Sequence, residues 1–158
     1  MRILAIDPGY DRLGVAVLEG DPSKPTVVWS DCIQPTKGAP EARLAVVSRA
    51  VGDAIKTHAP DALALESLFF STNVKTALKV AEARGTVLAQ AGLSGLPVIE
   101  CSPQQVKLAV TGYGAADKKA IARTVPKLVI LPPRSRLDDE LDAIAVGIAA
   151  LACGTTTP

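Results

Sequence analysis

Aromatic side chains are scarce in this chain, which limits how its interior can be built. Phe, Trp and Tyr make up 3% of the 158 residues, whereas hydrophobic residues as a whole make up 48%. A hydrophobic share of this size predicts a folded core rather than disorder, and that core must consist mainly of Ala, Val, Leu and Ile. The length suits one domain that buries most of its surface. We expect this domain to span residues 1–153, with 154–158 as a disordered tail.

Histidine and cysteine are too few for several common kinds of active site. His58 is the only histidine, and its place in KTHAP indicates the end of a helix, where a cation suits the helix dipole, rather than a catalytic imidazole. Cys32, Cys101 and Cys153 are widely spaced and form no C-x-x-C pair. They predict thiols in a reducing compartment and argue against a zinc site.

Long apolar runs are absent as well. No stretch is long enough to span a membrane, and the N-terminus lacks the pattern of a secretory signal peptide. We therefore expect a cytoplasmic protein without a membrane partner.

The chain as a whole has almost no excess of charge, but one of its segments does. The formal net charge is +1. Segment 107–136 carries seven basic residues and one acid, a net charge of +6, which leaves −5 for the remainder. Such a basic segment favours contact with phosphates, although solvated helix faces also collect lysines.

The hydrophobic pattern predicts strands that alternate with helices. Strand patterns cover 3–6, 13–18, 26–33, 62–66 and 97–101, and the first three fit an antiparallel meander because polar turns separate them. Helical periodicity covers about 40–58, 72–92 and 136–152. One further helix is expected to begin with Ser102 as its cap and Pro103 in its first turn, and another is expected to follow TGYGAADKK. These elements predict an α/β protein with a five-stranded mixed sheet and helices on both faces.

Acidic residues end two of the predicted strands and begin the last predicted helix. Asp7 and Glu66 follow apolar strands that we expect to be parallel neighbours, while Asp139 and Asp142 lie three positions apart on one helix face. Each acid also has a purely structural explanation, as a turn residue or as a favourable charge at a helix N-terminus. If the last helix starts near the same sheet edge, the four carboxylates repel one another, and a hard divalent cation such as Mg²⁺ or Mn²⁺ relieves that repulsion.

The motifs around these acids resemble those of the RuvC family of Holliday-junction resolvases, which have a ribonuclease H-like fold. The matching segments are IDPGYDRLGVAV, ALESLFFSTNVKTALKVAEARG, SPQQVKLAVTGYGAADK and DDELDAIAVGIA, in family order and over nearly the whole chain. The resemblance implies a crossover junction endodeoxyribonuclease that cuts four-way DNA junctions by two symmetric hydrolyses in recombination and repair. The nicks would carry 5′-phosphate and 3′-hydroxyl ends.

The resemblance also implies an active site. Its two Mg²⁺ or Mn²⁺ ions would be bound by four catalytic acids and assisted by two catalytic lysines, which fall on Asp7, Glu66, Asp139, Asp142, Lys107 and Lys118. Asp138 is adjacent to the third acid, but the alanine-rich run that follows the fourth acid sets the register.

DNA contacts are expected on both sides of this site. The candidate residues are aromatic or basic, namely Phe69, Phe70, Lys79, Arg84, Lys107, Lys118, Lys119 and Arg123. A base opened at the crossover can stack on Phe69 with about 1–3 kcal/mol. A core position is the alternative for both phenylalanines, and it is the more serious one for Phe70.

A four-way junction is approximately two-fold symmetric, so paired nicks imply a homodimer with one active site per protomer. The long helix from residue 72 is the candidate interface, although its apolar residues can equally belong to the core. The family further implies a RuvA tetramer and a RuvB helicase motor as branch-migration partners.

Other functions remain open at this point. They are another ribonuclease H-like nuclease, a junction-binding protein without catalysis, or an actin-like or sugar-kinase-like ATPase, for which one domain of this length is too short.

Overall fold

The computed structural model describes residues 1–67 and 74–153. Ten helices and strands lie in this part of the chain, in the order β1 (Arg2–Pro8), β2 (Leu13–Glu19), β3 (Thr26–Ile33), α1 (Pro40–His58), β4 (Ala62–Glu66), α2 (Val74–Leu93), β5 (Val98–Cys101), α3 (Pro103–Thr111), α4 (Lys118–Leu128) and α5 (Asp138–Cys153). The predicted ranges of β3, α1 and β4 are confirmed residue by residue. The three cysteines carry thiols and form no disulfide.

Two local predictions on the helices had different outcomes. Ser102 caps α3 as expected, because its side chain accepts the Gln105 amide while the Gln105 side chain accepts the Ser102 amide. The predicted start of the last helix at Arg136 is wrong by two residues. The guanidinium of Arg136 instead donates to the carbonyl oxygens of Pro132 and Arg134, which holds the preceding loop, and α5 begins at Asp138.

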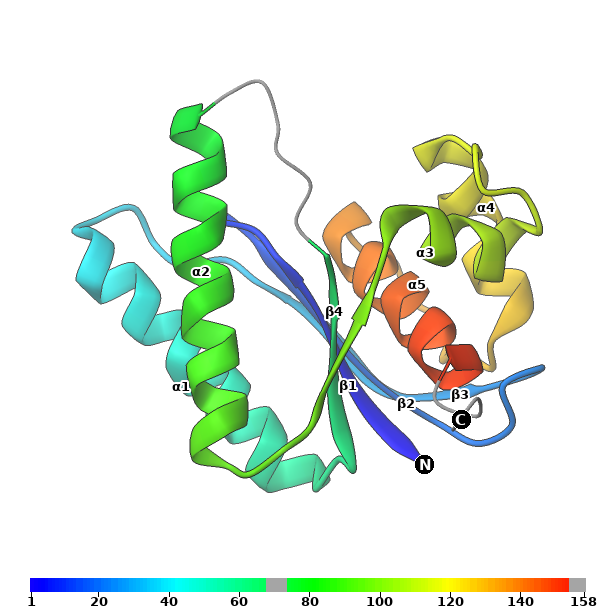
Figure 1. Ribbon diagram of the computed structural model, residues 1–158, viewed down its shortest axis with the longest axis horizontal. Helices are drawn as coiled ribbons and strands as arrows, with labels where there is room; N and C mark the ends of the chain where they lie inside the picture. Colours follow the sequence, from blue (N-terminus) through cyan, green and yellow to red (C-terminus); the bar gives the residue numbers. More distant parts are fainter. Residues whose placement is uncertain (68–73, 154–158) are drawn as a thin grey trace.

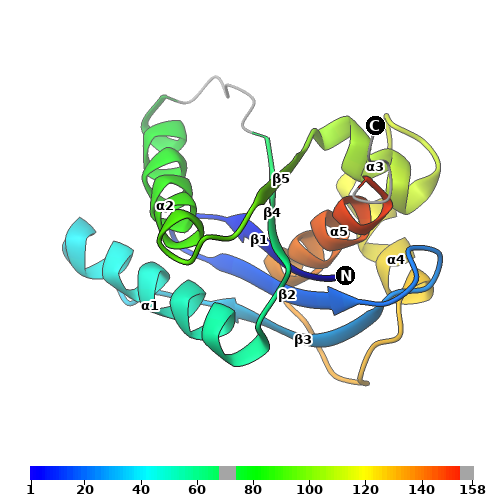
Figure 2. The ribbon, with the colours of Figure 1, turned by 60° about the horizontal axis from the view of Figure 1, so that its bottom comes forward.

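The five strands form one mixed sheet in the order β3-β2-β1-β4-β5 (Figure 1). The first three strands are antiparallel neighbours, as the meander predicted, and β1, β4 and β5 run parallel. Helices cover both faces, with α1 and α2 on one side and α3, α4 and α5 on the other (Figures 1 and 2). No helix in the described ranges is long and apolar enough to cross a membrane.

Alternation along the strands divides the interior into two apolar clusters. In β1, Ile3 and Ala5 face α5, whereas Leu4 and Ile6 face α1 and α2. The same rule assigns every inward side chain of the central strands to one face, because a shift of one residue would exchange the faces. A polar side chain that continues one of these rows therefore lies on a known face.

Helix α5 packs closely on β1 and β2, and two glycines permit this contact. A Cβ at Gly14 of β2 would overlap the carbonyl oxygen of Asp139, and a Cβ at Gly147 of α5 would overlap the side chain of Leu18. The N-terminal turn of α5 thus rests directly on the backbone of β2. This contact sets how far the first turn of α5 lies from the ends of the central strands.

Gly14→Ala is therefore expected to lower the free energy of unfolding by at least about 1–3 kcal/mol, because backbone atoms cannot yield as a flexible side chain would. Gly92→Ala in α2 is the matched control, since a Cβ there meets no atom within 4 Å. Chemical denaturation measures both variants. Equal stability of Gly14→Ala and the wild type would show that α5 does not rest on β2 as described.

Candidate active site

The strand register brings the first two acids together. Asp7 continues the row of Ile3 and Ala5, and Glu66 continues the row of Ala62 and Ala64, so both acids lie on the α5 face of the sheet. The parallel register pairs Ile6 with Leu65, which makes Asp7 and Glu66 the next residues of neighbouring strands. The prediction that these strands are parallel neighbours is confirmed.

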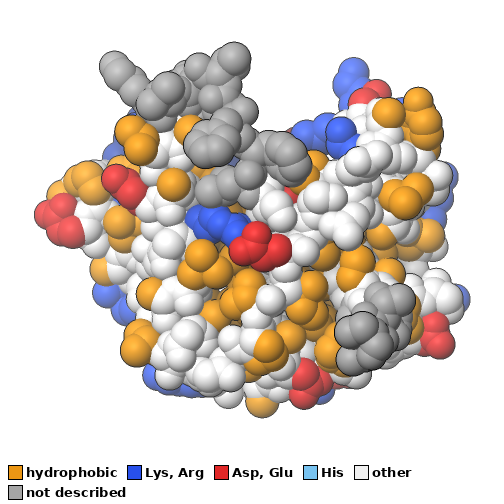
Figure 3. Space-filling model, in the orientation of Figure 1, with side chains coloured by type: hydrophobic (Ala, Val, Ile, Leu, Met, Phe, Trp, Pro, Cys, Tyr) orange, Lys and Arg blue, Asp and Glu red, His pale blue; other side chains and the backbone are white. Residues whose placement is uncertain are grey.

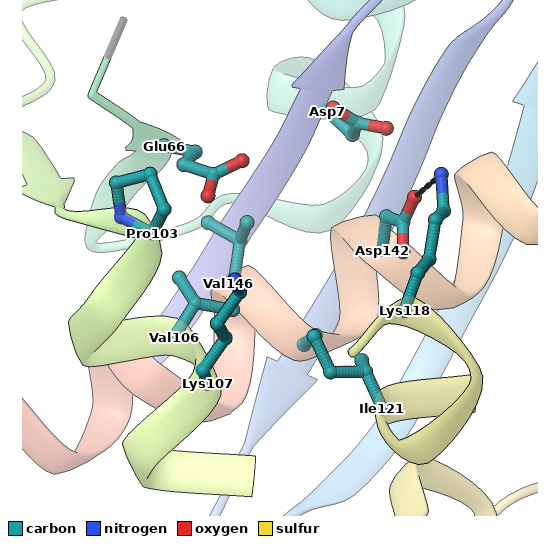
Figure 4. A pocket seen from close by; sticks show the side chains of 10 residues that line it. Asp7, Glu66, Pro103, Val106, Lys107, Lys118, Ile121, Asp142 and Val146 are labelled. Carbon is teal, nitrogen blue, oxygen red and sulfur yellow. Dashed lines mark ion pairs between the residues drawn. The ribbon is translucent and has the colours of Figure 1, made fainter. Parts of the chain in front are cut away.

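A pocket of about 230 Å³ lies where these strand ends meet α3, α4 and α5. Ten residues line it: Asp7, Glu66, Pro103, Val106, Lys107, Lys118, Ile121, Asp142, Ala145 and Val146. Glu66 from β4, Asp7 from β1 and Asp142 from α5 present their carboxylates to the same space (Figure 4). Three of the four predicted acids and both predicted lysines thus line one pocket.

Asp7 is the acid most strongly affected by this arrangement. Burial above all, and then repulsion by Asp142, Asp139 and Glu66, raise the pKa of Asp7 from 3.8 to about 7, although Lys118 opposes the rise. Burial, followed by repulsion from Asp142, also raises the pKa of Glu66. The pocket therefore concentrates negative charge that its own lysines only partly balance.

Two lysines supply positive charge from the opposite wall. Lys118, at the start of α4, places its Nζ 2.7 Å from Oδ2 of Asp142 (Figure 4). This hydrogen bond raises the pKa of Lys118, and burial raises the pKa of Asp142 although the lysine opposes that change. Lys107, on α3, lines the pocket and lowers the pKa of Glu66 against the effect of burial.

Asp139 departs from the prediction that all four acids share one pocket. It lies at the edge and does not line the pocket, and its Oδ2 accepts a bond of 3.3 Å from the guanidinium of Arg12. Its charge still raises the pKa of Asp7. Sequence reasoning missed Arg12, because nothing local links that turn residue to an acid 127 positions away.

The oxygen donors of the pocket fit a hard divalent cation. Among the described residues, neither His nor Cys lines it, and a carboxylate set of this kind suits Mg²⁺ or Mn²⁺ rather than Zn²⁺. Within the described ranges, no group of three or more Asp, Glu, His or Cys side chains stands ready as a metal ligand set. Asp142 and Asp139 are instead paired through Oδ2 with Lys118 and Arg12, so a cation would compete with these side chains for the two carboxylates.

The basic residues predicted to contact DNA lie in different environments. Lys119 and Arg123 are exposed on α4, and Lys79 is exposed on α2, where its Nζ lies 4.8 Å from the ring centre of Tyr10. In the view of Figure 3, Lys and Arg side chains gather at the upper edge on the α3–α4 side. Phe69 and Phe70 lie outside the described residues.

Arg84 differs from its predicted role. It is buried, its guanidinium donates to the backbone oxygen of Glu66 at 2.8 Å, and it pairs with Glu100 at 2.7 Å. The side chain therefore supports the end of β4 from within and is not presented to DNA. The sequence around Arg84 shows only that the residue is basic, which does not distinguish a contact with DNA from a buried structural role.

His58 takes no part in this site. It ends α1, stacks on Trp29 with 5.1 Å between ring centres, and its carbonyl accepts a bond from Arg2. The prediction that this histidine is structural agrees with its position.

The raised pKa of Asp7 predicts a pH-dependent stability when divalent cations are removed. The folded protein retains this proton up to about pH 7, whereas the unfolded chain releases it near pH 3.8, so stability falls as the pH rises between these values. Asp7→Asn removes the effect. In EDTA the variant is expected to be more stable than the wild type at about pH 8 by a few kcal/mol, with little difference at about pH 4.

Thermal unfolding in EDTA at both pH values measures this difference. A stability difference between Asp7→Asn and the wild type that is the same at both pH values would contradict the electrostatic explanation.

Comparison with known proteins agrees with this geometry. Residues 3–150 match the family model described as crossover junction endodeoxyribonuclease RuvC. A protein of that name from Thermosipho melanesiensis is 43% identical over 147 residues, which cover 92% of this chain and 94% of the relative. Another from Gloeobacter violaceus is 44% identical over 150 residues, covering 94% and 86%.

Solved structures give the same relationship. The structure titled T. thermophilus RuvC in complex with Holliday junction substrate superposes with a TM-score of 0.90 and 28% identity, over 98% of this chain and 96% of that one. A yeast mitochondrial Holliday junction resolvase, at 12% identity and a TM-score of 0.67 over 95% and 78%, shares the fold. The sheet and its helices are thus ribonuclease H-like, as predicted. Because the family model matches almost the entire chain, this protein belongs to the RuvC family.

Proposed function

We propose that this protein is a structure-selective endonuclease that resolves four-way DNA junctions by divalent-metal-dependent hydrolysis of phosphodiester bonds. The observation that carries the proposal is the convergence of Asp7, Glu66 and Asp142 with Lys107 and Lys118 in one pocket, in a chain of the RuvC family. Two symmetric cuts would leave 5′-phosphate and 3′-hydroxyl ends. These ends can be resealed, which suits a role in recombination and repair.

The acids hold the cations in this proposal. Asp7 lies between Glu66 and Asp142, so it can serve two neighbouring ions, with Asp139 joining from the edge after Arg12 releases it. Mg²⁺ or Mn²⁺ bound there would lower the pKa of an attacking water and stabilise charge on the leaving oxygen. The raised pKa of Asp7 supports this role, because it reflects both burial and the repulsion of neighbouring acids, and a bound cation would offset both effects.

The lysines act on the phosphate. If Asp142 bound a cation, the ammonium of Lys118 would be free of its ion pair and could contact a non-bridging phosphate oxygen. Lys107 faces the same space from α3. Both lysines are anchored on helices that line the pocket, where their positive charges would stabilise the developing negative charge.

DNA would enter along the basic surface beside the pocket. Lys119 and Arg123 on α4 would form this surface, and Lys79 on α2 would add a further contact, since all three side chains are exposed. Such contacts neutralise phosphates and weaken as salt rises. We propose that Phe69 and Phe70 meet an opened base at the crossover, because they follow Glu66 by three and four positions in the sequence.

A homodimer would present two such pockets to a two-fold symmetric junction. Helix α2 is the proposed interface, since Leu78 and Leu93 on it are 60% and 83% exposed. A RuvA tetramer and a RuvB helicase motor are the proposed branch-migration partners.

Asp7→Asn is expected to reduce cleavage of a synthetic four-way junction by more than about 10²-fold, as for the loss of a group that stabilises the transition state. Junction binding should remain, because the basic surface is intact. Asp138→Asn is the matched control, since it removes an exposed acid of the same cluster that does not line the pocket. It should retain most of the activity.

Cleavage is followed in Mg²⁺ and in Mn²⁺ by gel electrophoresis, and binding is followed by fluorescence anisotropy. Equal cutting of a linear duplex by the wild type would contradict junction selectivity, and full activity of Asp7→Asn would contradict the assigned role of this acid.

A further inference from the structure

A buried ionic cluster lies beside the acids of α5 and takes no part in the chemistry described above. Its centre is Glu140, whose side chain is 3% exposed, although it follows Asp139 directly in the sequence. The Glu140 carboxylate is bound by three side chains from outside its helix. These donors are Ser30 on β3 and two arginines of the loop before α5, Arg134 and Arg136.

The contacts join three separate parts of the fold. Ser30 Oγ donates to Glu140 Oε1 at 2.5 Å, which ties α5 to the sheet. Arg134 pairs with the same carboxylate and also donates to the backbone oxygen of Ser30 at 2.6 Å. Arg136 Nε lies 3.2 Å from Glu140 Oε1, and its other donors hold carbonyl oxygens of the 132–134 loop.

The location of this cluster allows it to affect the position of the first turn of α5. Ser30 pairs with Ala16 across β2 and therefore faces α5, as Gly14 does two residues away on β2. The first turn of α5 is thus held at two points, by its backbone contact with Gly14 and by the charges on Glu140. Asp139 and Asp142 flank Glu140 on that same turn, so their carboxylates move if the turn moves.

We propose that Glu140, held by Ser30, Arg134 and Arg136, is a positioning residue that sets Asp139 and Asp142 for binding a divalent cation. The proposal rests on the function proposed above, in which those two acids are ligands. Glu140 itself does not line the pocket, so it acts only through the placement of the helix. Groups that orient metal ligands in this way typically affect metal affinity or activity by about 10–100-fold.

The test compares Glu140→Gln with the wild type at a temperature where circular dichroism shows both to be folded. Glutamine keeps the shape of the side chain but removes the charge that two guanidinium groups share. Binding of Mn²⁺ without DNA is measured by electron paramagnetic resonance. Cleavage at saturating junction and junction affinity in EDTA are measured separately.

The proposal expects Mn²⁺ affinity and the cleavage rate of Glu140→Gln to fall by about 10–100-fold, with junction affinity within about two-fold of the wild type. Glu19→Gln is the matched control, because it removes a carboxylate paired with Arg2 at 2.7 Å at the far end of β2. It should leave Mn²⁺ binding unchanged. A folded Glu140→Gln with a lower melting temperature but wild-type Mn²⁺ affinity and rate would overturn the proposal, since Glu140 would then serve stability alone.

If Glu140→Gln does not fold, Ser30→Ala provides the same test with a smaller change, because both arginines stay in place. It is expected to weaken Mn²⁺ binding several-fold, and wild-type affinity would overturn the proposal. Mn²⁺ binding also separates the two proposals. A wild type that binds Mn²⁺ but cuts no junction would refute the proposed substrate, and the Mn²⁺ affinity of Glu140→Gln would still decide the role of Glu140.

Discussion

Repulsion between carboxylates is the interaction on which this site depends. Asp7 is half-buried at the end of β1, where loss of solvent and three neighbouring acids raise its pKa to about 7. Such an arrangement costs stability in a metal-free protein, and the ion pair between Lys118 and Asp142 offsets only part of the cost. A fold that holds this charge in place is prepared for a cation, because the ligands need not be brought together when the ion arrives.

The sheet positions two of the acids of the site, and α5 positions the others. Strand alternation and parallel register place Asp7 and Glu66, and neither can move without a shift of the apolar rows on both faces. The acids of α5 depend instead on how one helix turn sits on β2. Contact at Gly14 and the charges around Glu140 restrain that turn from two directions.

Much of this architecture follows from the sequence. Periodicity predicted the strands and most helix ranges, and the acids at the ends of β1 and β4 predicted the edge of the sheet that holds the pocket. The RuvC resemblance predicted Lys107 and Lys118, which local pattern alone does not distinguish from other lysines. Both line the pocket.

What the sequence did not predict depends on contacts between distant segments. The sequence predicts a surface cation at Arg84, but the side chain is buried and donates to the backbone oxygen of Glu66. Asp139 is paired with Arg12, which lies 127 positions earlier in the chain. From the sequence, Glu140 is an acid that suits the first turn of a helix. Only the fold shows that Ser30, 110 positions earlier, contacts it. Local propensity carries no information on such pairs.

Anomalous X-ray diffraction from crystals soaked in Mn²⁺ would show directly whether these carboxylates bind cations. Mn²⁺ peaks are expected among the carboxylates of Asp7, Glu66 and Asp142, with the ammonium of Lys118 displaced from Asp142. An empty pocket in crystals whose Mn²⁺ sites lie elsewhere on the protein would contradict this expectation.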